Sequence, residues 1–308
     1  MQVAGISRIG DRVGIIEVGE PGPLADDEVL LEVMAAGVGN WDEFVRTGGW
    51  DVGAWPPMAL GVEAAGRVMA AGRAVSDWAL GDAVMTHPVP LRDQGTWAPR
   101  LIAPAGLLAR KPDGASWEVA AAFPVPALTA EQVLSDTLHV CAGEQLLVNG
   151  AGGITGGLLV ALAALRGAQV IATAGPSSQQ RVTTLGARHV IDYHDQDWPA
   201  QVRAITANRG VDAAANAAPG GSASAIEAVA DGGRLATITS DPPGEQRGIT
   251  VCSSYVRPDG NQLRELATRF ADRQLEIPVA ASYRLADAAQ ALALVTHGRA
   301  AGAVVLTP

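Results

Sequence analysis

The sequence predicts an α/β protein in two parts, a mostly β part and a doubly wound parallel sheet. Residues 1 to about 110 carry short β-type segments interrupted by Gly and Pro, which is typical of a small β domain with irregular connections. From about Trp117, helical stretches alternate with short apolar strands. The run LLVNG, TGGLLVALAALRG, QVIAT, QQRVTTLG and HVIDY indicates β-α-β-α-β, the pattern of parallel strands connected by helices.

The individual elements follow from apolar periodicity and from turn residues between them. In the β part we expect strands at 13–18, 28–38, 59–72 and 82–87. Further strands at 211–217 and 232–238 extend the parallel sheet. The tail is expected to hold helices at 261–274 and 285–298 and a last strand at 302–308.

Composition limits the classes of function. The chain has 308 residues, 48% of them hydrophobic, so it can bury a sizeable core. Its net charge of −10 and its lack of a Lys/Arg cluster predict no nucleic-acid partner. The longest apolar stretch, around Leu158 to Leu165, is far shorter than the ~20 residues of a bilayer span, and the first residues lack a signal-peptide pattern. We therefore expect no membrane partner and a cytoplasmic location.

The small numbers of lysine and cysteine residues exclude further classes of active site and metal site. Lys111 is the only lysine, and no tyrosine has a lysine four positions later, so a Tyr-x-x-x-Lys dyad and a P-loop lysine are both absent. Cys141 and Cys252 are the only cysteines and make neither a disulfide framework nor a four-cysteine metal site.

A glycine-rich loop follows the strand LLVNG and leads directly into a helix. Glycines at 150, 153 and 156 let the backbone approach a pyrophosphate, and the helix N-terminus offers unpaired N–H groups and a partial positive charge. The alternative is a merely tight strand-to-helix turn. Because strand, helix and second strand have the right spacing, we predict that the loop binds a dinucleotide.

The end of the second strand bears on which dinucleotide binds. An NAD site usually has an Asp or Glu there to bind the ribose 2′-hydroxyl, and this chain has the neutral run ATAGPSS instead. Ser177, Ser178 and Arg181 could bind a 2′-phosphate, so we predict NADPH as the cofactor. The alternative is that the serines cap a helix and that Arg181 is solvated.

Several segments together resemble the medium-chain dehydrogenase/reductases, in particular their zinc-free quinone oxidoreductase branch, which includes zeta-crystallin-like proteins. The resemblance runs from EVLLEVMAAGVGNWDEFVRTG and ALGVEAAGRVMAAGRAVSDWALGDAVM through FPVPALTAEQVL and NGAGGITGG to LADAAQALALVTHGRAAGAVVL. It implies a Rossmann NADP-binding domain at 119–256, inserted into a GroES-like domain made of 1–118 and 257–308. It also implies a substrate cleft at the junction and a homodimer through the sheet edge near GITVCSSYV.

The same resemblance implies a set of cofactor-binding residues. These are Thr129, Gly150, Ala151, Gly152, Gly153, Ile154, Thr155, Gly156, Thr173, Ala174, Gly175, Ser177, Arg181, Tyr193, Ala217, Ala218 and Ile238. Ile154 and Thr155 depart from the Gly and Val that are usual in this branch.

Zinc ligands are missing where the alcohol dehydrogenases of the superfamily have them. Gly39 replaces a cysteine and Val62 replaces a histidine, so we expect no metal. The five histidines lack metal spacing and are expected to be ordinary surface or capping residues; they are His87, His139, His189, His194 and His297. Asp42 and Glu63 are expected to be structural acids.

Without a metal, the expected chemistry is hydride transfer from NADPH to a quinone or an α,β-unsaturated carbonyl compound. Asn40 is the candidate catalytic residue, as a donor to the developing oxyanion, and the alternative is that it forms a capping box with Glu43. Trp41, Trp50 and Trp55 are candidates for stacking on a planar substrate, or else pack in the core.

Two other functions stay open. An enoyl reductase that tailors a thioester or polyketide would keep the fold and the cofactor. An NADPH-binding structural or sensor protein with little turnover would belong to another class.

Overall fold

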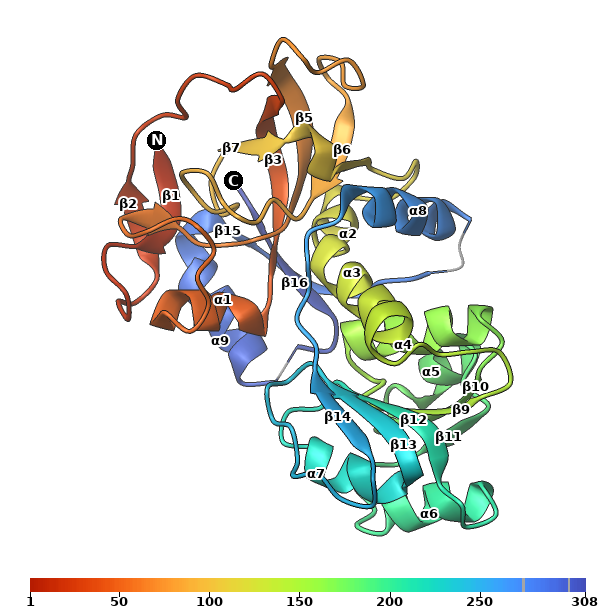
Figure 1. Ribbon diagram of the computed structural model, residues 1–308. Helices are drawn as coiled ribbons and strands as arrows, with labels where there is room; N and C mark the ends of the chain where they lie inside the picture. Colours follow the sequence, from red (N-terminus) through yellow and green to blue (C-terminus); the bar gives the residue numbers. More distant parts are fainter. Residues whose placement is uncertain (273–274, 299) are drawn as a thin grey trace. The chain divides into compact units, whose positions relative to one another are not determined.

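The computed structural model describes residues 1–272, 275–298 and 300–308 (Figure 1). The chain divides into unit 1, Met1–Val125 with Pro258–Pro308, and unit 2, Pro126–Arg257. Both ends of the chain therefore belong to one unit, and the middle of the chain forms the other. The predicted helix at 261–274 includes residues 273 and 274, which lie outside the described part of the chain, as does residue 299 after the predicted helix at 285–298.

Unit 1 is built mainly from antiparallel strands. Its strands are β1 (Gln2–Ile6), β2 (Gly14–Glu17), β3 (Glu28–Val38), β4 (Met58–Ala59), β5 (Ala64–Ala71), β6 (Ala83–Thr86), β7 (Arg100–Pro104), β8 (Leu108–Arg110), β15 (Val279–Arg284) and β16 (Ala303–Thr307). Its helices are α1 (Asn40–Thr47), α2 (Trp117–Ala121), α8 (Gly260–Ala271) and α9 (Ala288–Thr296). Helix α3 (Pro124–Gln132) begins in unit 1 and continues into unit 2.

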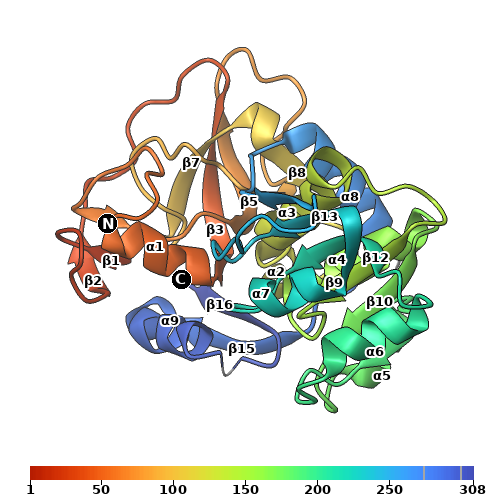
Figure 2. The same ribbon diagram turned by 60° about the horizontal axis from the view of Figure 1, so that its bottom comes forward.

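The long strand β3 joins the two ends of the chain in one sheet. In the described residues the larger sheet has the order β15-β16-β3-β5-β6-β8, with β7 also paired to β3, and a smaller sheet has the order β2-β1-β4. Strand β16 runs antiparallel to β3, with Val305 opposite Gly37. Helices α1 and α9 contact each other, and both views show them side by side (Figures 1 and 2). This arrangement is the GroES-like domain expected from the sequence.

Unit 2 is a doubly wound parallel sheet. Its elements in chain order are β9 (Gln145–Asn149), α4 (Ile154–Leu165), β10 (Gln169–Thr173), α5 (Gln179–Thr184), β11 (His189–Ile191), α6 (Trp198–Ile205), β12 (Val211–Asn216), α7 (Ser222–Ala225), β13 (Val229–Thr237) and β14 (Thr250–Ser253). The strand order is β11-β10-β9-β12-β13-β14, which reverses direction next to β9. The predicted Rossmann fold is confirmed. The homodimer predicted through the β14 edge stays a prediction.

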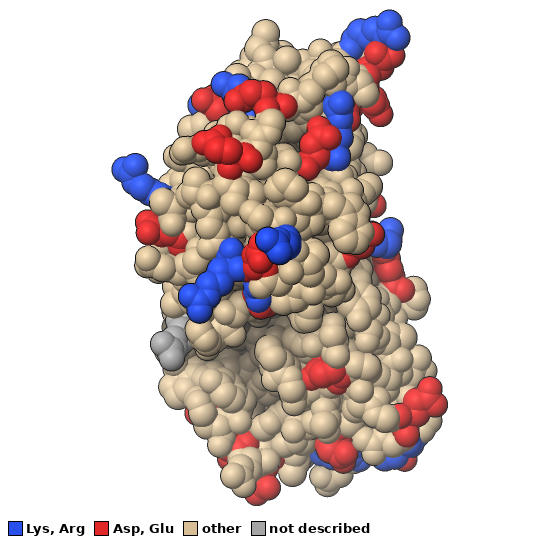
Figure 3. All heavy atoms as spheres, turned by 90° about the vertical axis from the view of Figure 1, so that its left-hand side faces the viewer, with Lys and Arg blue, Asp and Glu red and all other residues tan. Residues whose placement is uncertain are grey.

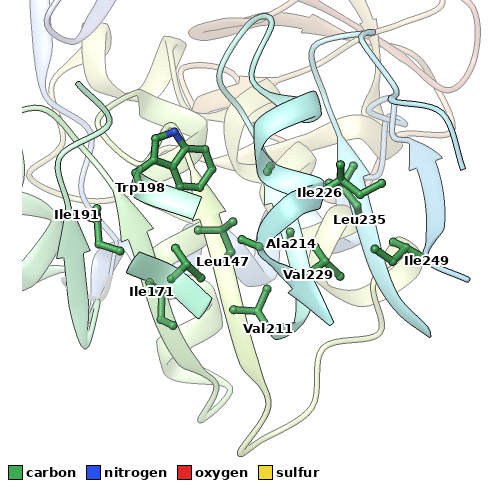
Figure 4. Close-up of a cluster of buried hydrophobic side chains, with 13 residues drawn as sticks. Leu147, Ile171, Ile191, Trp198, Val211, Ala214, Ile226, Val229, Leu235 and Ile249 are labelled. Carbon is green, nitrogen blue, oxygen red and sulfur yellow. The ribbon is translucent and has the colours of Figure 1, made fainter. Parts of the chain in front are cut away.

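Apolar residues of the strands and helices form the core of unit 2 (Figure 4). Leu147, Ile171 and Leu235 project from β9, β10 and β13 toward Trp198 of α6 and Ile226, which follows α7. All five are at most 7% exposed. Because both faces of a parallel sheet are covered by helices, its strands are apolar almost throughout, and polar residues are left for the strand ends.

No helix in the described part of the chain is both long enough and apolar enough to cross a bilayer. On the face drawn in Figure 3, Lys and Arg side chains lie in small separate groups, several of them beside Asp and Glu. The absence of a nucleic-acid partner stays a prediction.

Candidate functional site

The loop of residues 150–153, hereafter the glycine loop, connects β9 to α4 in unit 2. Gly150 has a φ of +84°, a left-handed conformation that residues with a side chain rarely adopt. The Gly150 N–H donates to Thr173 Oγ1 at 3.0 Å, and the Ala151 N–H donates to the Thr173 carbonyl at 3.0 Å. The end of β10 therefore holds the start of the loop.

Two glycines of the motif serve different purposes. A Cβ atom on buried Gly156 would lie 2.2 Å from the Gly150 carbonyl oxygen, so α4 can pack on the loop only without a side chain there. Gly153 precedes α4 and is exposed, and the nearest described atom to a Cβ there is the same oxygen at 3.6 Å. The packing of the chain itself does not require glycine at 153. A pyrophosphate that approaches the backbone from outside does require it, so the loop fits a dinucleotide.

Ser178 and Arg181 lie beside the glycine loop. The Arg181 guanidinium donates through Nη2 to the Gly152 carbonyl, and Ser178 Oγ is 2.7 Å from the position of a Cβ on Gly152. Ser178 occupies the position before α5, but its hydroxyl donates to the Gly175 carbonyl and does not cap the helix. The interpretation of Arg181 as a solvated helix residue is therefore wrong.

The other predicted cofactor residues of unit 2 surround the carboxyl ends of the strands. The Ala217 N–H donates to the Asn149 carbonyl at 2.8 Å, and the Ile238 N–H donates to the Asn216 carbonyl at 3.1 Å. A Cβ on Gly150 would lie 2.8 Å from the Ala218 nitrogen, so the loops after β9 and β12 meet.

Three further residues of the predicted set have distinct surroundings. Tyr193 is half exposed, and its ring lies against Gly175, 3.2 Å from the position of a Cβ there. Thr129 lies on α3 and is 9% exposed. Thr173 belongs to the predicted cofactor-binding set, and in the structure its buried hydroxyl holds the glycine loop.

Sequence reasoning missed a group of polar residues at this same sheet edge. Asn149, Asn216 and Thr237 end β9, β12 and β13, and each is at most 3% exposed. They connect by hydrogen bonds to Ser222 and to the carboxylate of Asp241. The available signal was that each apolar strand, LLVN, DAAAN and RLAT, ends on a polar residue.

Asp241 is the one acid in this group. Desolvation raises the pKa of its carboxyl, but hydrogen bonds from Thr237, Thr239 and Ser222 outweigh that effect and lower the pKa to about 2. The carboxyl is therefore ionised throughout the physiological range.

Asn40, the candidate catalytic residue, is exposed at the start of α1 in unit 1. The capping box predicted for Asn40 and Glu43 is wrong by one residue. Gly39 is the N-cap, and its N–H donates to Asp42 Oδ2 at 2.8 Å, while Glu43 forms an ion pair with Arg46 at 2.7 Å. Gly39 has the extended backbone of an N-cap, with φ −133° and ψ 171°.

The three candidate tryptophans differ in exposure. Trp55 is 69% exposed, whereas Trp41 and Trp50 are partly buried. The Trp41 ring lies against Gly39, where a Cβ would be 2.2 Å from its Cε2 atom. The Trp50 ring centroid is 6.3 Å from that of His87. Trp55 thus has the surface that stacking on a planar substrate needs, and Trp41 and Trp50 pack against neighbours.

Asp42 and Glu63 are buried, as expected for structural acids. Burial raises the pKa of Asp42 to about 8, against hydrogen bonds from the Gly39 and Gly61 backbones that lower it. Burial also raises the pKa of Glu63 well above its usual range, and the neighbouring Asp42 adds to the rise. Glu63 Oε2 accepts a hydrogen bond from the Val125 N–H at 2.8 Å.

The expectation that His87 is a surface or capping residue is wrong, because His87 is 1% exposed. Its Nδ1 atom lies 2.7 Å from the Val62 carbonyl, which can only accept, so Nδ1 carries the proton. Burial lowers the pKa of His87 to about 4, so the ring is neutral at pH 7. Within residues 1–272, 275–298 and 300–308, no three His, Cys, Asp or Glu side chains are arranged to hold a metal ion.

Two known protein families match separate parts of the chain. The alcohol dehydrogenase GroES-like domain family matches residues 25–113, and the zinc-binding dehydrogenase family matches residues 185–306. Solved structures match over the whole chain. An NAD-dependent alcohol dehydrogenase superimposes with a TM-score of 0.88 at 28% identity, and each chain is covered to 100%.

Two more solved structures carry information about ligand and activity. A mycobacterial protein complexed with NADPH has a TM-score of 0.85 at 26% identity, with 100% of both chains covered. A quinone oxidoreductase from Pseudomonas syringae has a TM-score of 0.86 at 25% identity and covers 100% of this chain and 99% of its own.

Among curated proteins, erythronolide synthase EryA2 from Saccharopolyspora erythraea is 34% identical over 297 residues. The match covers 92% of this chain and 8% of that synthase, so the chain spans a small part of that relative's length. A 2-haloacrylate reductase from Burkholderia is 34% identical over 205 residues, 64% of this chain and 59% of that enzyme. The two family matches, the full-length structural likeness and these relatives show that the chain belongs to the medium-chain dehydrogenase/reductase family.

Proposed function

We propose that this protein is an NADPH-dependent, zinc-independent reductase that transfers a hydride to a quinone or to an α,β-unsaturated carbonyl compound. The observation that carries the proposal is the glycine loop with Ser178 and Arg181 beside it and no acid at the end of β10. The family binds NAD(P). A neutral strand end with an adjacent guanidinium accommodates a 2′-phosphate, which a carboxylate would repel.

The residues of the chain bind and orient the cofactor. The N–H groups of the first turn of α4 would face the pyrophosphate, with Gly153 leaving room for it. When bound, NADPH supplies the hydride that reduces the acceptor. The likeness to a structure in complex with NADPH, to a quinone oxidoreductase and to a 2-haloacrylate reductase supports this choice of cofactor and acceptor. Asn40 and the three tryptophans remain candidates for contacts with the acceptor.

A second candidate is the reduction of an unsaturated thioester during polyketide assembly. The match to erythronolide synthase EryA2, which extends over 92% of this chain, favours it. The cofactor and the hydride transfer are common to both candidates, and only the acceptor differs.

The deciding experiment follows the near-ultraviolet absorbance of NADPH with a panel of quinones, enones, enoyl thioesters and aldehydes. Oxidation with quinones or enones supports the proposed function. Oxidation with thioesters alone supports the second candidate. NADPH binding without oxidation by any acceptor would contradict both and favour a structural or sensor protein.

The role of Arg181 predicts a cofactor-dependent loss. We expect Arg181→Ala to weaken NADPH binding more than NADH binding, by roughly ten-fold or more, because a hydrogen bond to a charged group contributes about 1.5–3 kcal/mol. Isothermal titration with both cofactors measures the difference. Arg181→Gln separates the two contacts of this side chain, because it keeps a donor for the Gly152 carbonyl but loses the charge.

Arg188→Ala, which removes an exposed arginine elsewhere in unit 2, is the control for net charge. Equal losses for NADPH and NADH in Arg181→Ala would show that Arg181 only supports the loop. Tighter binding of NADH by the parent protein would contradict the cofactor preference itself.

Independence from zinc is a separate prediction. Gly39 and Val62 have no side chain that can bind a metal, so treatment with a chelator should leave the rate of NADPH oxidation unchanged. Rates before and after treatment, with the metal content measured in the same samples, test this. A loss of rate that added Zn²⁺ restores would contradict it.

A further inference from the structure

A continuous chain of hydrogen bonds crosses the carboxyl edge of the sheet in unit 2. It starts at the Gly150 N–H and passes through the Thr173 hydroxyl, the Asn149 amide, the Asn216 amide and the Ser222 hydroxyl to the Asp241 carboxylate. We call these groups the polar chain. It links the glycine loop to a residue 91 positions further along the sequence.

Every hydrogen bond of the polar chain points the same way. A backbone N–H can only donate, so Thr173 Oγ1 accepts from Gly150 at 3.0 Å, and the Thr173 hydroxyl donates its own proton to Asn149 Oδ1 at 2.6 Å. This orients the Asn149 amide, whose Nδ2 donates to Asn216 Oδ1 at 2.8 Å. The donors of these three bonds therefore follow one another from Gly150 through Thr173 to Asn149.

The far end of the polar chain is a strong acceptor. Asn216 Nδ2 donates to Ser222 Oγ at 2.8 Å, and Ser222 Oγ donates to Asp241 Oδ1 at 2.7 Å. The hydroxyls of Thr237 and Thr239 donate to the same carboxylate oxygen, each at 2.6 Å. Hydrogen bonds to an ionised group are the stronger ones, and a chain of aligned donors polarises each next bond.

We infer that Asp241 is a positioning residue for the glycine loop, because the polar chain that begins at Gly150 ends on its carboxylate. The carboxylate holds the hydroxyl of Thr173, through the amides, in the orientation that accepts the Gly150 N–H. Gly150 is thereby kept at φ +84°, and the loop is formed before a dinucleotide arrives. A preformed loop binds more tightly because less conformational entropy is lost on binding. The inference rests on the proposed function in one respect, that this loop binds the cofactor phosphates.

The test compares variants at the two ends of the polar chain. Thr173→Val removes the hydroxyl and should weaken NADPH binding about ten-fold, whereas Thr173→Ser keeps the hydroxyl and should bind like the parent. Asp241→Asn should weaken binding several-fold, and Asp197→Asn, the same change at an exposed residue of unit 2, should not. In the double variant Thr173→Val/Asp241→Asn the two losses should not add, because both break one chain.

A second readout needs no cofactor. Hydrogen exchange at the Gly150 amide should become faster in Asp241→Asn than in the parent, and unchanged in Asp197→Asn. If Asp241→Asn does not fold, Ser222→Ala breaks the polar chain one link earlier and is expected to have the same effects.

The possible failures can be told apart. A parent protein that binds neither NADPH nor NADH would contradict the proposed function, and the exchange of the Gly150 amide would still decide the positioning role. Additive losses in the double variant, or unchanged exchange at Gly150 in Asp241→Asn, would overturn the inference.

Discussion

A Gly153→Val variant should no longer be stabilised by NADPH, although its own fold should be nearly intact. A side chain at 153 would occupy the space through which a pyrophosphate reaches the loop backbone. The chain itself tolerates the change, because the nearest described atom to a Cβ at 153 is 3.6 Å away and the backbone φ is −78°. Replacing glycine at an N-cap by valine costs about 1 kcal/mol, which corresponds to a fall in melting temperature of about 2–4 °C.

Thermal unfolding with and without saturating NADPH measures both effects. The parent should gain stability with the logarithm of the NADPH concentration above its Kd, and Gly153→Val should gain none. Gly156→Ala is the matched control with the opposite pattern, because its Cβ would lie 2.2 Å from the Gly150 carbonyl oxygen and should destabilise the protein without ligand. If Gly153→Val binds NADPH like the parent, the loop is not the phosphate site, and the proposed function would have to be withdrawn.

Asp42→Asn should make the protein more stable at pH 8 than the parent, and the difference should grow as the pH rises from about 4. Burial raises the pKa of Asp42 to about 8, so between pH 4 and pH 8 the folded chain keeps a proton that the unfolded chain releases. The contribution of Asp42 is fully present below its ordinary pKa of 3.8 and is lost as the pH rises through 8, at about 1.4 kcal/mol per pH unit. Asparagine stays neutral and its oxygen can still accept from the Gly39 N–H, so this loss disappears.

Urea unfolding at several pH values between 5 and 8 gives the free energy of unfolding for each protein. The parent should lose stability with rising pH more steeply than Asp42→Asn. Asp77→Asn, which makes the same change at an exposed residue of unit 1, should keep the slope of the parent. Parallel slopes for the parent and Asp42→Asn would mean that Asp42 is already ionised in the folded chain at pH 5.

Local patterns were sufficient for strands β9 to β13 and for helices α4 and α5 of unit 2. The apolar strands, the glycines between β9 and α4 and the alternation with helices each involve neighbours in sequence, so periodicity and turn residues predict them. Local patterns also predicted β3, which is long, and β16, which is strongly apolar. The start of α1 was misplaced by one residue because asparagine is a typical N-cap residue, whereas the extended backbone of the N-cap lies at Gly39.

The contacts of buried polar groups were the part of the structure least predictable from the sequence. His87 looked like a surface residue because nothing near it in sequence shows that β5 and β6 bring it under the Val62 carbonyl. Arg181 could equally have pointed to solvent, and its contact with Gly152 depends on how α5 packs beside the glycine loop. The polar chain joins residues 149, 173, 216, 222 and 241, which have no common motif.

The sequence by itself determined the class of fold, the place of the glycine loop and the family, because these depend on short-range patterns and on the order of motifs along the chain. Only the tertiary structure decided which polar residues act together. Parallel strands that are distant in sequence end at the same edge of the sheet, and there the last residue of each strand meets the others. Asn149, Thr173 and Asn216 form hydrogen bonds with one another because their strands end side by side. These bonds connect Asp241 to the glycine loop.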